Sequence, residues 1–260
     1  MSIELAVSSV ILALRPRPEG AQTSRTTDAP AKTLWTPLVR RIREPYQGSW
    51  ALPGGPLGLE CGLAQAARET LRRTTGLDPR YLEQLYCFGG LDRARGTSDP
   101  LPSAELVHGQ VRPPRVVSIV YWALVRPEED AAATPIDAAG GIDPVNVSWF
   151  PVDDLPDLAF DHREILTYAL DRLRAKITYS PIAHAFLPDA FTLADLREVY
   201  ESVLDRDIDP ANFRRQMLAR GHLEATGEKL TGASHRPPSL YRYRAQLVAT
   251  SPTPPPRSAS

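Results

Sequence analysis

Hydrophobic residues divide the chain into two regions with different periodicities. Residues 1–157 contain short runs of β-branched and aromatic residues, of which Arg115–Val125 is the clearest. Such runs, bounded by Pro- and Gly-rich segments, are typical of buried strands. One segment, residues 63–75, instead places its apolar residues on one helical face and is followed by Gly76, a helix stop signal. The first region is therefore predicted to be an α+β domain.

The segments between these elements are rich in Pro, Gly and Arg. Residues 15–32, 89–114 and 127–141 show no hydrophobic period and are predicted to be loops. After Pro156 the period becomes helical, with apolar residues at helical spacing through residues 159–177. This helix is predicted to connect the first region to the second.

Two further helices follow, and each begins with a capping signal. Thr192 precedes the first, and Asp209 followed by Pro210 opens the second. Strand-like pieces around residues 223–230 and 240–243 come next. Two helices followed by a two-stranded wing form a winged helix-turn-helix, a DNA-binding arrangement.

Composition limits the classes of function. The chain has 260 residues, a net charge of −1 and two cysteines, too few for a disulfide framework or a zinc site. No apolar run approaches the roughly 18 residues of a membrane span, and no signal peptide is recognised. We therefore expect a cytoplasmic protein, associated with the nucleoid if it binds DNA.

Charge is unevenly distributed in the second region. Residues 189–209 contain seven acidic and two basic residues, a net charge of −5, whereas residues 210–244 contain seven basic and two acidic residues, a net charge of +5. The positive part covers the second helix and the wing, which such modules place on DNA. Charge alone fits a solvated helix equally well, and the order of helix, helix and wing favours the DNA-binding surface.

A glycine loop followed by a helix occupies the segment from Leu52 to Leu77. The segment resembles the Nudix box, in which acidic residues on one helix face hold Mg²⁺ while water attacks a pyrophosphate. The box consists of a glycine, a glutamate, Arg-Glu, a Glu-Glu pair one turn later and a closing glycine. The loop and the helix match this pattern, whereas the acidic pair is missing.

Two registers align the segment with the box. The first matches the early part of the motif, at Gly54, Glu60, Arg68 and Glu69. The second matches both glycines and the core leucines, at Gly55, Leu71, Gly76 and Leu77. We prefer the second register, because glycines and core leucines fix the backbone. In either register an arginine, Arg72 or Arg73, stands where the acidic pair is expected, and its charge repels Mg²⁺.

The whole chain resembles the NrtR family, the Nudix-related transcriptional regulators of NAD metabolism. The resemblance covers roughly residues 5–245. Besides the box it rests on blocks that follow one another in order: Gln84–Gly89, Arg115–Tyr121, Ala159–Leu166, Leu173–Ser180, Ala185–Pro188, positions within Phe191–Glu201, Asn212–Arg215 and positions within Arg236–Tyr241.

This resemblance implies an α+β fold class, a Nudix-like α/β/α sandwich domain followed by a winged helix-turn-helix domain. We expect an effector-sensing domain at 1–157, a connecting helix and linker at 158–180, a DNA-binding domain at 181–246 and a disordered tail at 247–260. It also implies a homodimeric repressor of NAD biosynthesis or salvage genes, released from operator DNA by ADP-ribose or a related NAD-derived nucleotide. No cofactor is expected to be required, because the missing acids put Mg²⁺ binding and pyrophosphatase activity in doubt.

Six residues near the box are candidate contacts to the effector. Glycines let the backbone approach a diphosphate, arginines match phosphate oxygens bidentately, and an aromatic ring can stack on a base. The candidates are Arg41, Arg43, Trp50, Gly54, Gly55 and Arg115. The structural alternatives are a plain turn for the glycines, surface positions for the arginines and a core position for the tryptophan.

Eight residues are candidate contacts to DNA. Asparagine reads adenine and arginine reads guanine in the major groove, and wing residues reach phosphate or the minor groove. The candidates are Thr192, Asn212, Arg214, Arg215, Lys229, Ser234, His235 and Arg236. The apolar neighbours Phe213, Met217 and Leu218 are predicted to lie in the core.

Two other classes of function remain. An active Nudix hydrolase, an ADP-ribose pyrophosphatase with an accessory C-terminal domain, would use Glu60 and Glu69 as a weak metal site. A protein-interaction adaptor would neither bind DNA nor turn over a nucleotide. DNA binding that ADP-ribose weakens separates the repressor from both.

Overall fold

The computed structural model describes residues 3–18, 32–90, 93, 105–107, 110–112, 115–131, 146–230 and 237–248. The candidate wing residues Ser234, His235 and Arg236 lie outside these ranges. Of the tail expected at 247–260, residues 249–260 also lie outside them, whereas residues 247 and 248 belong to a short helix. No helix in the described ranges is long and apolar enough to cross a membrane.

Seven strands form one mixed sheet in the order β3-β2-β1-β8-β5, with β4 paired to β1 and β9 paired to β2. The strands are β1 (Ile3–Pro16), β2 (Lys32–Arg40), β3 (Trp50–Ala51), β4 (Gly54–Pro56), β5 (Tyr81–Phe88), β8 (Arg115–Val125) and β9 (Val147–Pro151). The two longest, β1 and β8, pair in parallel at the centre, from Ile3 opposite Arg115 to Ala13 opposite Val125. The clearest strand of the sequence is thus the centre of the sheet.

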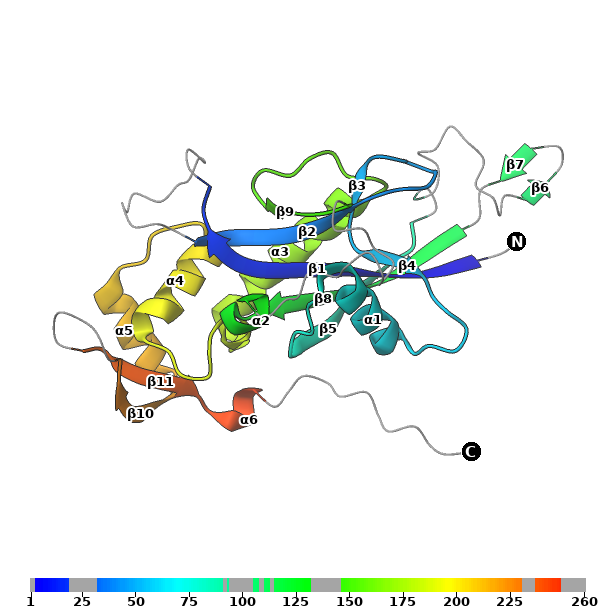
Figure 1. Cartoon of the computed structure of the whole chain (residues 1–260). Helices are drawn as coiled ribbons and strands as arrows, with labels where there is room; N and C mark the ends of the chain where they lie inside the picture. Colours follow the sequence, from blue (N-terminus) through cyan, green and yellow to red (C-terminus); the bar gives the residue numbers. More distant parts are fainter. Residues whose placement is uncertain are drawn as a thin grey trace, which may run out of the picture.

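One long helix covers each face of the sheet, with α1 (Leu63–Thr75) and α3 (His162–Tyr179) on opposite sides (Figure 1). Side chains alternate along a strand, so successive residues of β1 and β8 enter two separate cores. Val7 and Ile11 pack with Leu71 of α1, whereas Val10 and Leu12 pack with the apolar face of α3. This arrangement confirms the predicted α/β/α sandwich.

The second region folds as predicted, with α4 (Leu193–Leu204), α5 (Pro210–Ala219), β10 (Leu223–Lys229) and β11 (Ser239–Tyr243). A 3-10 helix (Ile182–Phe186) precedes these elements and a short helix, α6 (Ala245–Val248), follows them. Figure 1 shows them grouped at one end of the sheet.

Both predicted helix caps are present. The Thr192 hydroxyl accepts a hydrogen bond from the Asp195 N–H at 3.1 Å, and the Asp195 carboxylate accepts one from the Thr192 N–H at 2.8 Å. This reciprocal capping box fixes the start of α4. At α5 the Asp209 carboxylate accepts from the Asn212 N–H at 2.8 Å, with Pro210 at the first helical position. The sequence signals therefore place both helices correctly.

Ion pairs join the acidic part of the winged helix to the first region. Lys32 Nζ lies 2.9 Å from a carboxylate oxygen of Glu198 on α4. Arg17 Nη2 lies 3.1 Å from Asp205, the residue that caps the end of α4. A third pair joins Arg126 Nη1 to Asp189 Oδ1 at 2.6 Å. α4 also contributes to the same hydrophobic core as β2 and α3, so the winged helix is docked on the sheet.

Three expectations about local structure are wrong. The segment expected as a loop after Val125 begins with a helix, α2 (Pro127–Ala131), whose proline and three acidic residues suit a helix N-terminus. The long loop expected at 89–114 contains a hairpin of β6 (Glu105–Val107) and β7 (Gln110–Arg112), each too short to show a period. Leu218 is 40% exposed, because α5 buries a single stripe through Phe213 and Met217.

Candidate ligand pocket and winged helix

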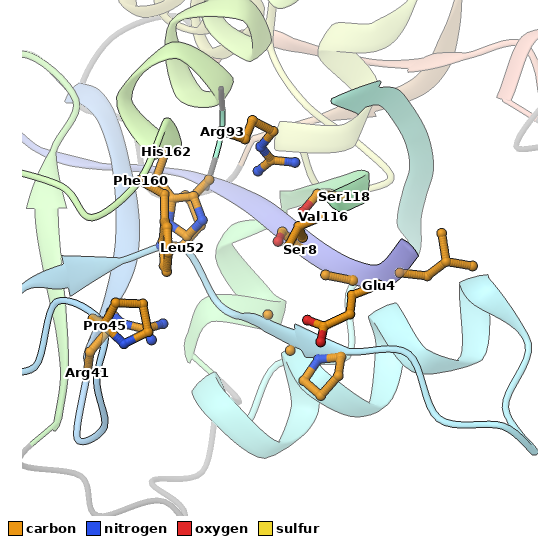
Figure 2. A pocket seen from close by; sticks show the side chains of 15 residues that line it. Glu4, Ser8, Arg41, Pro45, Leu52, Arg93, Val116, Ser118, Phe160 and His162 are labelled. Atoms are coloured by element: carbon orange, nitrogen blue, oxygen red, sulfur yellow. Dashed lines mark hydrogen bonds between the residues drawn. The ribbon is translucent and has the colours of Figure 1, made fainter. Parts of the chain in front are cut away.

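A cavity of about 310 Å³ lies on the α3 face of the sheet, beside the first residue of α3 (Figure 2). Under α3 this face carries large side chains such as Leu12 and Trp122. Towards the cavity the same strand positions become small or polar, with Ala6 and Ser8 on β1 and Ser118 on β8. Because α3 begins only at His162, this helix does not cover this end of the face, and the volume of the cavity suits a small molecule.

Residues from several separate segments line the cavity. They are Glu4, Leu5, Ala6, Ser8, Arg41, Pro45, Leu52, Gly54, Gly55, Pro56, Arg93, Val116, Ser118, Phe160 and His162. The lining contains two arginines and one glutamate. Because Arg93 is also paired with Asp161, an anionic ligand is favoured by the placement of the guanidinium groups and not by a net charge.

The glycine loop reaches the cavity as strand β4. β4 pairs with β1, with Gly54 opposite Ser8 and Gly55 opposite Val7. A Cβ atom on Gly54 would lie 2.8 Å from the Val7 carbonyl oxygen, whereas a Cβ on Gly55 would meet nothing within 4 Å. Gly54 is therefore required for the close approach of two backbones, a role distinct from contact with a diphosphate.

His162, the first residue of α3, is bonded to the loop before β4. Its Nδ1 accepts a hydrogen bond from the Leu52 N–H at 3.0 Å. Burial, with further contributions from Arg93 and Arg41, lowers the pKa of His162 to about 3. The imidazole is therefore neutral, and because Nδ1 is an acceptor, its proton is on Nε2. His162 thus holds the loop and presents one N–H donor.

Arg93 is the second cation of the cavity and is held on two sides. Its Nε and Nη2 lie 2.6 and 2.8 Å from the two carboxylate oxygens of Asp161, and its Nη1 donates to the Phe88 carbonyl oxygen at 2.8 Å. The side chains of Arg93 and Asp161 are 9% and 14% exposed. Sequence reasoning missed Arg93, since it lies in a segment read as a polar loop and carries no local signal.

Arg41 lies on the opposite side of the cavity from Arg93 (Figure 2). It follows Arg40, the last residue of β2. Its Nε donates to the Pro45 carbonyl oxygen at 2.7 Å, and its guanidinium lies 4.7 Å from the centre of the Phe160 ring. Partial burial lowers the pKa of Arg41, but guanidinium remains charged in proteins. It therefore supplies a fixed positive charge.

The structure brings three of the six candidate effector contacts to the cavity, namely Arg41, Gly54 and Gly55. Arg43 is exposed beyond the end of β2, and Arg115 is exposed at the start of β8 with Nη2 3.5 Å from the Gly89 carbonyl oxygen. Trp50 packs edge-on against Phe150, with ring centres 5.0 Å apart. These three do not line the cavity, and Trp50 borders the core.

The helix of the box lies away from the cavity, on the other face of the sheet. Its sequence contains one acidic residue, Glu69, and three arginines. Glu69 accepts a hydrogen bond from Gln65 at 2.7 Å, and Arg72 pairs with Asp78 at 2.7 Å. Glu60 is exposed ahead of the helix. Within the described ranges no group of three or more potential metal ligands is found.

The candidate DNA contacts on α5 form one exposed surface. Asn212, Arg214 and Arg215 are exposed, and Arg215 Nη2 donates to Asn212 Oδ1 at 2.8 Å. Phe213 and Met217 form the buried stripe of the same helix, as predicted. Elsewhere, Lys229 is exposed as the last residue of β10. Thr192 is 4% exposed, with its hydroxyl inside the capping box.

Residues 183–243 match the family model described as the NrtR DNA-binding winged helix domain. NtrR of Acinetobacter baylyi, an ADPR responsive transcriptional repressor, is 31% identical over 214 residues, which cover 80% of this chain and 75% of that protein. The chain belongs to the NrtR family. This confirms the resemblance drawn from the sequence blocks.

Solved structures agree with membership of the NrtR family. The crystal structure of Shewanella oneidensis NrtR with a 27mer DNA matches with a TM-score of 0.65 and 27% identity, over 92% of this chain and 93% of that one. An ADP-ribose pyrophosphatase of Methanocaldococcus jannaschii is 30% identical over 131 residues, which cover 50% of this chain and 62% of that enzyme. The fold is thus that of an NrtR-family regulator, with a Nudix part shared with enzymes.

Proposed function

We propose that the chain is a transcriptional repressor that binds operator DNA and releases it when ADP-ribose, or a related NAD-derived nucleotide, enters the cavity on the α3 face. The observation that carries this proposal is the presence in one chain of a cationic small-molecule cavity and a winged helix with an exposed Asn-Arg surface. The Acinetobacter relative is ADPR responsive, and the Shewanella relative was crystallised with DNA. Both support the assignment.

On the DNA side, α5 enters the major groove with Asn212, Arg214 and Arg215 facing base edges and phosphates. Lys229 on β10 contacts the backbone from the wing, together with the candidates Ser234, His235 and Arg236. Thr192 contributes by fixing the start of α4. Its hydroxyl is engaged by Asp195, so a direct phosphate contact requires the capping box to open.

On the effector side, Arg41 and Arg93 hold the diphosphate between them, and Gly54 and Gly55 let the β4 backbone approach it. Guanidinium groups bind phosphate oxygens through paired N–H donors. His162 and the hydroxyls of Ser8 and Ser118 supply neutral hydrogen bonds for sugar hydroxyls. Trp50, Arg43 and Arg115, which do not line the cavity, would contact an effector only at its rim.

We further propose that the chain does not hydrolyse its effector and needs no metal. A Mg²⁺ site needs several oxygen ligands on one side, and the box helix offers only Glu69 beside three arginines. That carboxylate is already engaged by Gln65. A regulator that consumed its own signal would also report it poorly.

The proposed assembly is a homodimer, with residues 1–157, 158–180 and 181–246 as sensor, connector and DNA-binding domain and NAD biosynthesis or salvage genes as targets. A two-fold symmetric repressor binds two half-sites about one helical turn of DNA apart. Light scattering of the purified chain tests the dimer, and the symmetry of the selected DNA sequence tests the half-sites.

The decisive experiment is a fluorescence anisotropy titration with a duplex selected from random DNA by the protein itself. ADP-ribose is expected to weaken binding at least tenfold, while ribose 5-phosphate, which lacks the diphosphate, has little effect. A protein that selects no DNA sequence, or whose binding ignores ADP-ribose, contradicts the proposal.

A hydrolase is the second candidate, favoured by the identity to the Methanocaldococcus enzyme. Release of AMP and ribose 5-phosphate from ADP-ribose with Mg²⁺, abolished by Glu69→Gln, would establish it.

A further inference from the structure

Three consecutive residues at the start of α3 contact three different walls of the cavity. Phe160 packs on Tyr46 of the turn after β2, with ring centres 4.8 Å apart. Asp161 pairs with Arg93, and His162 accepts from Leu52 in the loop before β4. The walls of the cavity thus converge on the first turn of a single helix.

The backbone at this point is held in an unusual conformation. Phe160 has φ of 55°, and its contact partner Tyr46 has φ of 64°. Left-handed φ values are rare for residues other than glycine and persist only where surrounding contacts impose them. The contacts in the cavity wall therefore determine how the chain enters α3.

α3 connects this point directly to the DNA-binding region. The helix has 18 residues and extends roughly 27 Å at 1.5 Å per residue. It ends at Tyr179, two residues before the 3-10 helix of the winged helix. Its buried face belongs to the same hydrophobic core as α4 and Phe213 of α5. A change in the position of its first turn is therefore transmitted through packed side chains.

Arg93 is the residue for which an anionic ligand can compete with Asp161. It lines the cavity, yet two of its nitrogens are used by Asp161. Hydrogen bonds to Asp161 and to the Phe88 carbonyl oxygen engage three of the five N–H donors of the Arg93 guanidinium. A phosphate at the cavity therefore shares this guanidinium with the Asp161 carboxylate, and it brings a second negative charge towards that carboxylate. Like charges at such distances repel strongly in a buried site.

We propose that Asp161 couples effector binding to DNA release: in the free protein it holds Arg93, and an anionic effector takes Arg93 over and displaces the first turn of α3. Asp161 is then a positioning residue. It contributes to the coupling between effector binding and DNA release, and it lowers the affinity for the effector. The inference rests on the proposed function and adds the residue through which the effector acts. Arg93 contacts the effector, whereas Asp161 does not.

The experiment compares Asp161→Asn with Glu164→Gln in the full-length chain. Both changes remove one negative charge from the first turn of α3, and Glu164 is exposed and does not line the cavity. The Asp161 side chain accepts no capping hydrogen bond from α3, so Asp161→Asn weakens the contact with Arg93 without removing a helix cap. The measurements are the Kd for ADP-ribose by calorimetry and the Kd for selected DNA with and without saturating ADP-ribose.

Asp161→Asn is expected to bind ADP-ribose as tightly as the wild type or up to about tenfold tighter, because Arg93 is freed. The ratio of DNA Kd values with and without ADP-ribose is expected to fall at least threefold, since coupling is a ratio between two states. Glu164→Gln should leave both quantities within twofold. An unchanged ratio in Asp161→Asn, or a loss of ADP-ribose binding, would overturn the proposal.

Arg93→Met supplies an independent test if Asp161→Asn does not fold. It is expected to weaken ADP-ribose binding at least tenfold, and an unchanged ADP-ribose Kd would overturn the role of Arg93. Failure of ADP-ribose to release DNA from the wild type would refute the proposed function itself. Release from the wild type and equally from Asp161→Asn would refute the coupling alone.

Discussion

The two binding regions of this chain are built in opposite ways. The surface of α5 is contiguous in sequence, with Asn212, Arg214 and Arg215 exposed on one helix. The cavity is assembled from several segments between Glu4 and His162, and its charged groups are partly buried and engaged. An exposed helix can lose side chains without affecting the fold, whereas side chains of an assembled cavity also hold its walls together. Substitutions should therefore change binding alone on α5, but binding and stability together in the cavity.

The largest effect is expected from the double substitution Arg214→Ala and Arg215→Ala. Each arginine that contacts a base or phosphate contributes roughly 1–3 kcal/mol, so DNA affinity should fall more than tenfold while the melting temperature stays constant. The control removes two exposed arginines elsewhere, Arg73→Ala with Arg172→Ala. Anisotropy titrations at several salt concentrations should also show a shallower salt dependence. Unchanged DNA binding in the double variant would refute the assignment of α5.

In the cavity, Gly54→Ala is expected to cost stability as well as binding. The new methyl group would meet the Val7 carbonyl oxygen and Ser8 at 2.8 Å, and forced overpacking costs roughly 1–3 kcal/mol. Gly55→Ala is the matched control, because its methyl group meets nothing within 4 Å. Urea unfolding and ADP-ribose calorimetry on both variants compare the two glycines. Equal stability of the two variants would show that β4 is not held to β1 as described.

The stability of the cavity wall should depend on pH through His162. Because burial lowers its pKa from 6.5 to about 3, the unfolded chain binds a proton in that range that the folded chain excludes. The contribution of neutral His162 to the free energy of unfolding is complete above pH 6.5. It is lost as the pH falls towards 3, at up to about 1.4 kcal/mol per pH unit. His162→Gln keeps an acceptor for Leu52 but does not titrate.

The free energy of unfolding, measured with urea between pH 4 and 7, should therefore decrease less steeply with falling pH in His162→Gln than in the wild type. Burial also lowers the pKa of His184, so a second variant, His184→Gln, should flatten the profile further in the same direction. Parallel profiles for wild type and His162→Gln would mean that folding does not change the pKa of His162.

The smallest effect is expected from Glu69→Gln. This residue lies on the helix across the sheet from the cavity and contacts Gln65. The variant should match the wild type within twofold in ADP-ribose affinity, and neither should release AMP in the presence of Mg²⁺. A Mg²⁺-dependent product that disappears in the variant would identify the hydrolase.

The sequence predicted the contiguous region well and the assembled region only in part. The limits of α1 and β8, the caps at Thr192 and Asp209, and the winged helix all follow from local signals. Such signals act between residues a few positions apart. The glycine loop also carries such a local signal, because the close approach of the β4 and β1 backbones requires a glycine at position 54 itself.

The remaining cavity residues could not be found in this way. Arg93 and Phe160 come together at the cavity only when β1 and β8 pair and α3 begins beside them. The parity of β8 also explains why Arg115 does not line the cavity. The cavity is lined by Val116 and Ser118, and odd-numbered residues of that strand point to the other face.

The ion pairs between α4 and the first region have a consequence for how DNA binding is measured. Three of the seven acidic residues within residues 189–209 pair with basic residues of the first region, namely Glu198 with Lys32, Asp205 with Arg17 and Asp189 with Arg126. These pairs offset part of the negative charge of the acidic segment and hold it against the first region. Added salt weakens these pairs as well as the phosphate contacts. The DNA affinity of the intact chain should therefore decrease more steeply with salt than expected from the number of phosphate contacts alone.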